Sequence, residues 1–232
     1  MSLLASLRDE VLHTNIELAR RGLALATFGN ASGIARDAGL VVIKPSGVAY
    51  DAMRPDDLVI TDLDGRVVEG ALRPSSDLAT HLVLYRAFPF VGGVVHTHSH
   101  YATVWAQTRR AIPCLGTTHA DYFHGEIPVT DDMEPVEIES RYEENTGHVM
   151  VRRLEALDPE AVPAVLVAGH GSFCWGATVA AALQTATMLE MVAHLAFDTV
   201  TLASDASPIS DALLDKHFHR THGPAAYYGQ PR

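Results

Sequence analysis

Short runs of β-type residues alternate with helical segments along the whole chain, and this alternation restricts the fold more than any other feature. Residues 40–43, 58–61 and 164–168 are apolar runs rich in β-branched side chains, and turn residues bound them. No linker, internal repeat or low-complexity stretch divides the 232 residues. The pattern therefore predicts one α/β domain over residues 1–232, with a sheet flanked by helices.

A hairpin and several helices complete the predicted order of elements. Asp64-Gly65 stands between Thr61-Asp62 and Val67-Val68, which is a strong signal for a tight hairpin. The run from Gly93 to His98 is typical of a further strand. Helical spacing and helix-start residues predict helices over residues 4–21, 78–84, 100–107, 143–157, 177–202 and 209–220.

The charge balance limits the partners that the chain can bind. Seventeen lysines and arginines stand against 28 aspartates and glutamates, which gives a formal net charge of −11. A protein that binds nucleic acid needs an excess of cationic surface, so no nucleic-acid partner is expected. A small anionic substrate stays possible, because one local pocket can hold it.

Neither a membrane span nor a secretory signal is predicted from the sequence. No run approaches 18 apolar residues, and Asp9 and Glu10 interrupt the apolar stretch at the N-terminus. The two cysteines, Cys114 and Cys174, are too few for a disulfide scaffold. We therefore expect a reducing, cytoplasmic compartment and no membrane partner.

Histidine is the unusual residue of this composition, with 13 copies, five of them within residues 96–124. His96 and His98 flank Thr97 on a predicted strand, where side chains two residues apart leave the same face. Two imidazoles on one face can fix two corners of a tetrahedral Zn²⁺ site, and His170, after the run 164–168, is a third candidate ligand. Exposed or packed histidines are the alternative, and we prefer it for those on predicted helices, which are His13, His148 and His194.

Small, donor-rich turns are the other candidate binding segments. Ser46-Gly47 and Ser75-Ser76 offer hydroxyl and backbone N–H groups that can cradle an anion, although ordinary capping and turning would explain them as well. Gly29-Asn30 is a plain turn by itself. Asp121 lies in a polar stretch and is either a general base or a solvated carboxylate, and Tyr228 lies in an aromatic C-terminal tail.

Seven segments together resemble the class II aldolase/adducin family, and the resemblance runs essentially from end to end. The block at 117–123 and the C-terminal pair of motifs match the sugar-phosphate epimerases of that family more specifically than His96-Thr97-His98-Ser99 does. The segments are Phe28-Gly29-Asn30, Ile43-Lys44-Pro45-Ser46-Gly47-Val48, Pro74-Ser75-Ser76-Asp77, Val95-His96-Thr97-His98-Ser99, Gly116-Thr117-Thr118-His119-Ala120-Asp121-Tyr122-Phe123, Leu214-Asp215-Lys216-His217 and Tyr227-Tyr228-Gly229-Gln230.

The resemblance implies a fold and a site. The implied fold is α/β and class II aldolase-like, with a central, mostly antiparallel β-sheet flanked by α-helices. The implied metal ligands are Asp77, His96, His98 and His170. Asp121 and Tyr228 match the acid/base pair of the epimerases. The implied substrate-binding residues are Gly29, Asn30, Lys44, Ser46, Gly47, Ser75, Ser76, Thr117, His217 and Arg220.

The resemblance also implies an activity, the interconversion of L-ribulose 5-phosphate and D-xylulose 5-phosphate. The hydrogen on C4 is not α to the C2 carbonyl, so inversion at C4 requires retro-aldol cleavage of the C3–C4 bond. The C4 oxygen then lies on opposite sides of the site before and after inversion, which requires two acid/base groups. Zn²⁺ is the expected cofactor, and Mn²⁺ or Co²⁺ would accept the same ligands.

The partners implied are a phosphorylated ketopentose and further copies of the chain, in a C4 homotetramer with active sites at subunit interfaces. Arabinose catabolism would use this step, and an L-xylulose route would use it as well. The nearest competing function is that of an aldolase or decarboxylase of the same family, but the aldolases carry glutamate where this chain has Asp77. A non-catalytic adducin-like scaffold and a metal-dependent hydrolase stay open as more distant possibilities.

Overall fold

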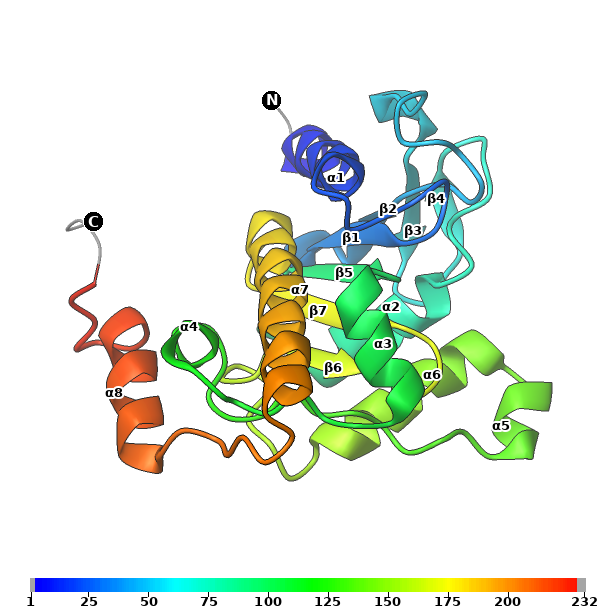
Figure 1. The fold of residues 1–232 in the computed structure, drawn as a ribbon. Helices are drawn as coiled ribbons and strands as arrows, with labels where there is room; N and C mark the ends of the chain where they lie inside the picture. The colour runs from blue at the N-terminus through cyan, green and yellow to red at the C-terminus, as the bar shows by residue number, and fades with distance from the viewer. Residues whose placement is uncertain (1–2, 229–232) are drawn as a thin grey trace.

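A computed structural model describes residues 3–228 and shows one seven-stranded sheet with helices on both faces (Figure 1). Every pair of neighbouring strands in the sheet is antiparallel, which confirms the fold expected from the resemblance. In spatial order the strands are β4 (Val67–Glu69), β3 (Val59–Asp62), β2 (Leu40–Ile43), β1 (Asn30–Ala35), β5 (Gly93–Thr97), β7 (Ser172–Gly176) and β6 (Ala164–Leu166).

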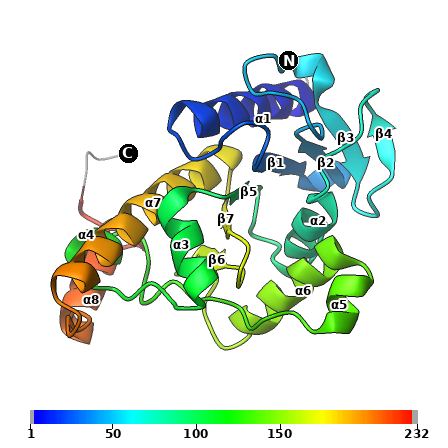
Figure 2. The ribbon, with the colours of Figure 1, turned by 45° about the vertical axis from the view of Figure 1, so that its right-hand side comes forward.

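The helices form two layers, because successive side chains of each central strand face opposite sides of the sheet. Val94 of β5 packs in a core beneath α2 and α6, whereas Val95 packs in a core beneath α1, α3 and α7. Figure 2 shows these two groups of helices on either side of the strands. The helices are α1 (Leu3–Arg20), α2 (Leu78–Ala87), α3 (His100–Thr108), α4 (Thr117–Ala120), α5 (Pro135–Glu139), α6 (Tyr142–Leu154), α7 (Val179–Leu202) and α8 (Asp211–Thr221).

Strand β1 is central and fully buried, yet its sequence gives little strand signal. It consists of small residues with one β-branched side chain, Ile34, whereas β-type runs are normally rich in such side chains. The small residues are needed because a methyl group on Gly33 would lie 2.5 Å from Val179 Cγ2 and 2.7 Å from Leu7 Cδ1. The turn predicted at Gly29-Asn30 is wrong, because the turn lies earlier, at Ala26-Thr27, and β1 begins at Asn30 directly after Gly29, which has φ +80°.

Several predicted bounds differ from the structure by a few residues. The run 164–168 ends as a strand at Leu166, and the run 93–98 ends at Thr97, so the residues that follow are free to leave the sheet plane. Strand β7 and the short helices α4 and α5 were not predicted. The hairpin at Asp64-Gly65 is confirmed by the antiparallel pairing of β3 with β4.

Helix α7 is long and apolar enough, by length and composition alone, to cross a membrane, although the sequence predicted no span. Half of its most apolar 18-residue window is buried within the fold. It packs on β7, β5, α3 and α1. Its hydrophobicity is therefore that of a core helix.

Candidate metal centre

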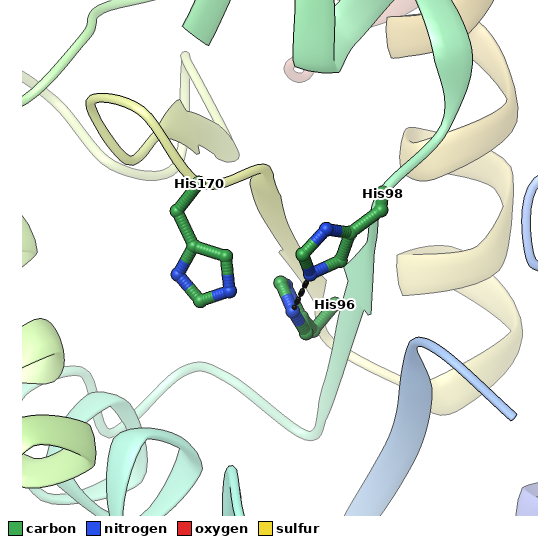
Figure 3. A group of neighbouring side chains, drawn as sticks. All are labelled: His96, His98 and His170. Atoms are coloured by element: carbon green, nitrogen blue, oxygen red, sulfur yellow. Dashed lines mark hydrogen bonds between the residues drawn. The ribbon is translucent and has the colours of Figure 1, made fainter. Parts of the chain in front are cut away.

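Three histidines converge at one end of the central strands (Figure 3), and their ligand nitrogens all lie within 4.8 Å of one another. We call His96, His98 and His170 the histidine centre. His96 is on β5, His98 follows the end of that strand, and His170 lies in the turn between β6 and β7. The Nε2 atoms of His96 and His98 are 3.1 Å apart. A tetrahedral ion with metal–nitrogen bonds of about 2.0–2.1 Å would hold two such atoms about 3.3 Å apart.

The hydrogen bonding of His96 leaves the correct nitrogen free for a metal. Its Nδ1 lies 2.9 Å from the backbone oxygen of Ser172. A carbonyl oxygen can only accept, so Nδ1 carries the proton and Nε2 presents a lone pair toward His98. Metal-binding histidines are commonly oriented in this way, by a carbonyl that holds the other ring nitrogen.

Burial keeps the histidine centre neutral. His96 is 1% exposed and its ring stacks on Phe173 at 4.2 Å. This burial lowers the pKa of His96 to about 3, and burial also lowers the pKa of His98 and of His170. Protons therefore compete weakly with a metal at neutral pH. In Figure 3, Nε2 of His170 faces His96 and His98, whereas its Nδ1 lies on the far side of the ring and is buried without a hydrogen-bond partner among residues 3–228.

Asp77 adds a carboxylate beside these rings. It occupies the N-cap position of α2, but its side chain does not cap that helix and instead accepts a 2.6 Å hydrogen bond from Asn30 Nδ2. Burial alone would raise the pKa of Asp77, but the neighbouring His96 and His81 rings and the hydrogen bond from Asn30 outweigh it, so its pKa lies below the ordinary value. Asp77 thus stays anionic and balances the charge of a divalent cation.

The histidine centre and Asp77 line a cavity of about 410 Å³, which is within the usual range of small-molecule binding sites. Seven of the ten predicted substrate-binding residues line the same cavity. They are Gly29, Asn30, Lys44, Ser46, Gly47, Ser75 and Ser76. Sequence reasoning did not identify five further lining residues, which are Thr27, Phe28, Pro45, Tyr142 and Glu143.

Backbone hydrogen bonds hold the two serine-containing loops side by side. The N–H of Ser75 donates to the oxygen of Lys44, and the N–H of Ser46 donates to the oxygen of Arg73, both at 2.9 Å. Lys44 itself is 2% exposed and donates from Nζ to the oxygen of Pro45 at 3.2 Å. Its burial lowers its pKa. The loops thus join one ammonium group to hydroxyl and N–H donors, a combination that suits an anion.

Tyr142 and Glu143 reach the cavity from the first turn of α6. The Tyr142 ring centroid lies 6.3 Å from that of His170. In the sequence these residues only begin a predicted helix, and acidic residues in a first turn are ordinary helix-start residues. No local signal distinguishes them, because it is the packing of α6 against α2 that brings them to the cavity.

The predicted acid/base pair lies in a second group of side chains, on α4 and α8, which we call the Asp121 cluster. Asp121 accepts hydrogen bonds from Arg220 Nε and Nη2, at 2.8 and 2.6 Å, and from His217 Nδ1 at 3.0 Å. The Arg220 guanidinium lies 4.7 Å from the centre of the Tyr228 ring. Thr117 completes the cluster, because its backbone oxygen accepts from the Asp121 N–H.

The Asp121 cluster is separate from the histidine centre within one chain. Among the residues that the structure describes, none of the cluster lines the 410 Å³ cavity. In Figure 1, α4 and α8 lie on the opposite side of α7 from α3. Burial would raise the pKa of Asp121, but the hydrogen bonds from Arg220 and His217 outweigh it and lower that pKa. Gly229 and Gln230 of the C-terminal motif lie outside the described residues.

A family model and curated relatives each match most of the chain. The family described as class II aldolase and adducin N-terminal domain matches residues 9–197. The chain is 51% identical over 224 residues, or 97% of its length and 98% of the relative's, to L-ribulose-5-phosphate 4-epimerase UlaF of Salmonella paratyphi A, and equally to that of Salmonella typhi.

Solved structures show the same fold at lower identity. An L-fuculose 1-phosphate aldolase is 24% identical, with a TM-score of 0.78 over 94% of this chain and 95% of that one. The L-fuculose-1-phosphate aldolase from Thermus thermophilus is 26% identical, with a TM-score of 0.69 over 89% of this chain and 100% of that one.

Proposed function

This chain belongs to the class II aldolase and adducin family, and we propose that it is an L-ribulose-5-phosphate 4-epimerase, which converts L-ribulose 5-phosphate into D-xylulose 5-phosphate and back. The observation that carries the proposal is the 51% identity to curated epimerases over nearly the full length of both chains. The whole chain, residues 1–232, acts as one domain in this proposal.

The cavity beside the histidine centre supplies the binding site for the phosphosugar. Its two serine-containing loops offer hydroxyl and N–H donors, which hold the phosphate at a fixed distance from the reacting carbons. In this proposal Lys44 donates to a substrate oxygen, and Asn30 lines the same part of the site while the two N–H groups of its Nδ2 hold Ser75 and Asp77. Tight retention matters, because cleavage of C3–C4 produces two fragments, and the aldehyde must stay near its partner to rejoin it.

The three neutral imidazoles fit a divalent metal, and we propose zinc in this role, with Asp77 of the same cavity as the fourth ligand. His96, His98, His170 and Asp77 would hold it. When bound, the ion supplies Lewis-acid stabilisation of negative charge that develops on substrate oxygens during cleavage.

Proton transfer at the C4 oxygen falls to Asp121 and Tyr228. After cleavage the aldehyde turns over and the bond re-forms, so the oxygen needs one group on each side of the site. Both residues belong to the Asp121 cluster, apart from the cavity of their own chain. We therefore propose a homotetramer with C4 symmetry, in which the cluster of one subunit faces the histidine centre of its neighbour, with Thr117, His217 and Arg220 around the substrate.

The decisive experiment is an assay of the purified, zinc-loaded protein with L-ribulose 5-phosphate. We expect D-xylulose 5-phosphate as the product, with no accumulation of free fragments. Release of glycolaldehyde phosphate as an end product would identify an aldolase and overturn the proposal. A reducing, cytoplasmic location and a role in arabinose catabolism follow from the same proposal, and growth of a deletion strain on arabinose checks the latter.

A further inference from the structure

Helix α3 connects the two segments that carry His98 and His170 of the histidine centre. Its first residue, His100, follows His98 after a single residue. Near its other end, the oxygen of Ala106 accepts a 2.9 Å hydrogen bond from the N–H of Gly169, the neighbour of His170. A shift of α3 along or about its axis would therefore move both histidines relative to His96, which the sheet holds.

The start of α3 is capped by a residue from another helix. Ser99 occupies the N-cap position but makes no capping hydrogen bond through its side chain. Instead, Glu190 of α7 accepts from the N–H of Tyr101 at 2.8 Å and from the N–H of Ala102 at 3.0 Å, one with each carboxylate oxygen. The negative charge also complements the positive end of the helix dipole.

A second bond from α7 fixes the middle of the same helix. Nε1 of Trp105 donates to the backbone oxygen of Ala193 at 3.0 Å, and Trp105 is buried. Glu190 and Ala193 lie three residues apart on α7, so they present one face of that helix to α3. The hydrogen bonds to Glu190 and to Ala193 together oppose rotation of α3 against α7. A single one of these contacts would leave α3 able to turn about it.

We propose that Glu190 is a positioning residue for the metal centre, which holds α3 so that His98 and His170 face His96 at bonding distance. The inference rests on the proposed metal site, but it assigns a task to a residue outside the cavity. Outer residues that orient metal ligands are known to change metal affinity by about 10–100-fold when they are replaced.

The test compares Co²⁺ binding by the wild type, Glu190→Gln and Glu190→Asp, with thermal unfolding of each metal-free protein. Glutamine keeps the size but loses the charge and one acceptor, and aspartate keeps the charge but is too short to reach both N–H groups. The matched control is Glu10→Gln. Glu10 accepts from the Ala180 N–H at 3.1 Å at the start of α7, a similar cross-helix cap that is remote from the histidines.

We expect both Glu190 variants to bind Co²⁺ at least about tenfold more weakly than the wild type and to alter the visible spectrum of the bound ion. Glu10→Gln should bind Co²⁺ with the affinity and spectrum of the wild type. Unchanged Co²⁺ affinity and spectrum in both Glu190 variants, with only a lower melting temperature, would reduce Glu190 to a stability role. Failure of the wild type to bind Co²⁺ would instead overturn the metal site of the proposed function.

Discussion

The histidine centre and the Asp121 cluster use similar side chains on very different supports. His96 extends from a central strand that is paired on both sides, and burial lowers the pKa of all three rings of the histidine centre. The Asp121 cluster joins the short helix α4 to helix α8. Of the residues 211–221 that form α8, Phe218 alone is buried. Asp121 and Arg220 form an ion pair there, and Nδ1 of His217 is hydrogen-bonded to the same carboxylate.

This difference shows which group can bind a ligand within one chain. Unprotonated nitrogens directed at a common point are ready for a cation without any rearrangement. The carboxylate of Asp121 already accepts hydrogen bonds from Arg220 and His217. Within the described part of the chain, Asp121 does not line the cavity beside the histidines. The first group offers three ligand nitrogens within one chain, whereas the described residues of the second line no part of the same cavity.

The largest expected effect comes from His98→Ala, which removes a ligand from the exposed side of the histidine centre. We expect loss of bound zinc and a decrease in turnover of at least about 10³-fold, because charge stabilisation worth several kcal/mol disappears. Elemental analysis and the epimerase assay measure the two effects together. Full activity of a metal-free His98→Ala protein would show that the histidine centre is not a metal site required for the reaction.

Tyr228→Phe should separate the two regions cleanly. The change removes one hydroxyl from the Asp121 cluster, so zinc content and melting temperature should match the wild type, whereas turnover should fall about 10²–10⁴-fold. Steady-state kinetics on the zinc-loaded variant measure the decrease. Retained epimerisation at the wild-type rate would remove Tyr228 from the acid/base pair.

Mixed assemblies test whether the two regions meet between subunits. When inactive His98→Ala and Tyr228→Phe chains are combined in equal amounts, about a quarter of the interface sites should contain both native residues. Activity should return to that extent after the chains are unfolded and refolded together. An inactive mixture that has formed heteromers would show that each site draws both residues from one chain.

Zinc itself should stabilise the first region alone. At a free zinc concentration of 100 times the dissociation constant, we expect about 2.7 kcal/mol of added stability, measured by urea unfolding with and without a chelator. The gain should persist in Tyr228→Phe and vanish in His98→Ala. Equal stabilisation of all three proteins would point to a zinc site elsewhere in the chain.

The smallest effect is expected for Arg220→Gln, which releases the Asp121 carboxylate. Asp121 has a lowered pKa in the folded protein, so its ion pair stabilises the fold above the ordinary pKa of an aspartate, about 3.9. That contribution disappears as the pH falls through the lowered pKa. The variant should therefore be slightly less stable than the wild type at pH 7 in urea unfolding, and the difference should close at low pH. A difference independent of pH would exclude the ion pair as its cause.

The fold was predictable where the strands carry large apolar side chains. Residues 40–43 and 58–61 indicate their strands through leucine, valine and isoleucine alone. Strand β1 escaped prediction because Gly33 must leave room for Leu7 and Val179, so packing selected residues that lack strand propensity. Local strand propensity does not predict a glycine that is required by packing against two helices, α1 and α7, that are distant in the sequence.

The sequence predicted those site residues that follow one another at a regular spacing along the chain. His96 and His98 follow a two-residue period, so their convergence could be inferred from strand geometry, even though the strand ends between them. The placement of Asp77 beside them depended on the family resemblance. Glu143 was missed, because the packing of α6 against α2 brings it to the cavity without any motif of its own.

The position of His96 in the sheet also determines how the protein can open. His96 pairs with Asn30 of β1 on one side and with Phe173 of β7 on the other. Displacing it requires breaking two ladders at once, so its amide should exchange hydrogen only through global unfolding. Helix α8 has one buried side chain and can detach locally at far lower cost. The proposed metal site should therefore open far more rarely than helix α8, which carries His217 and Arg220 of the Asp121 cluster.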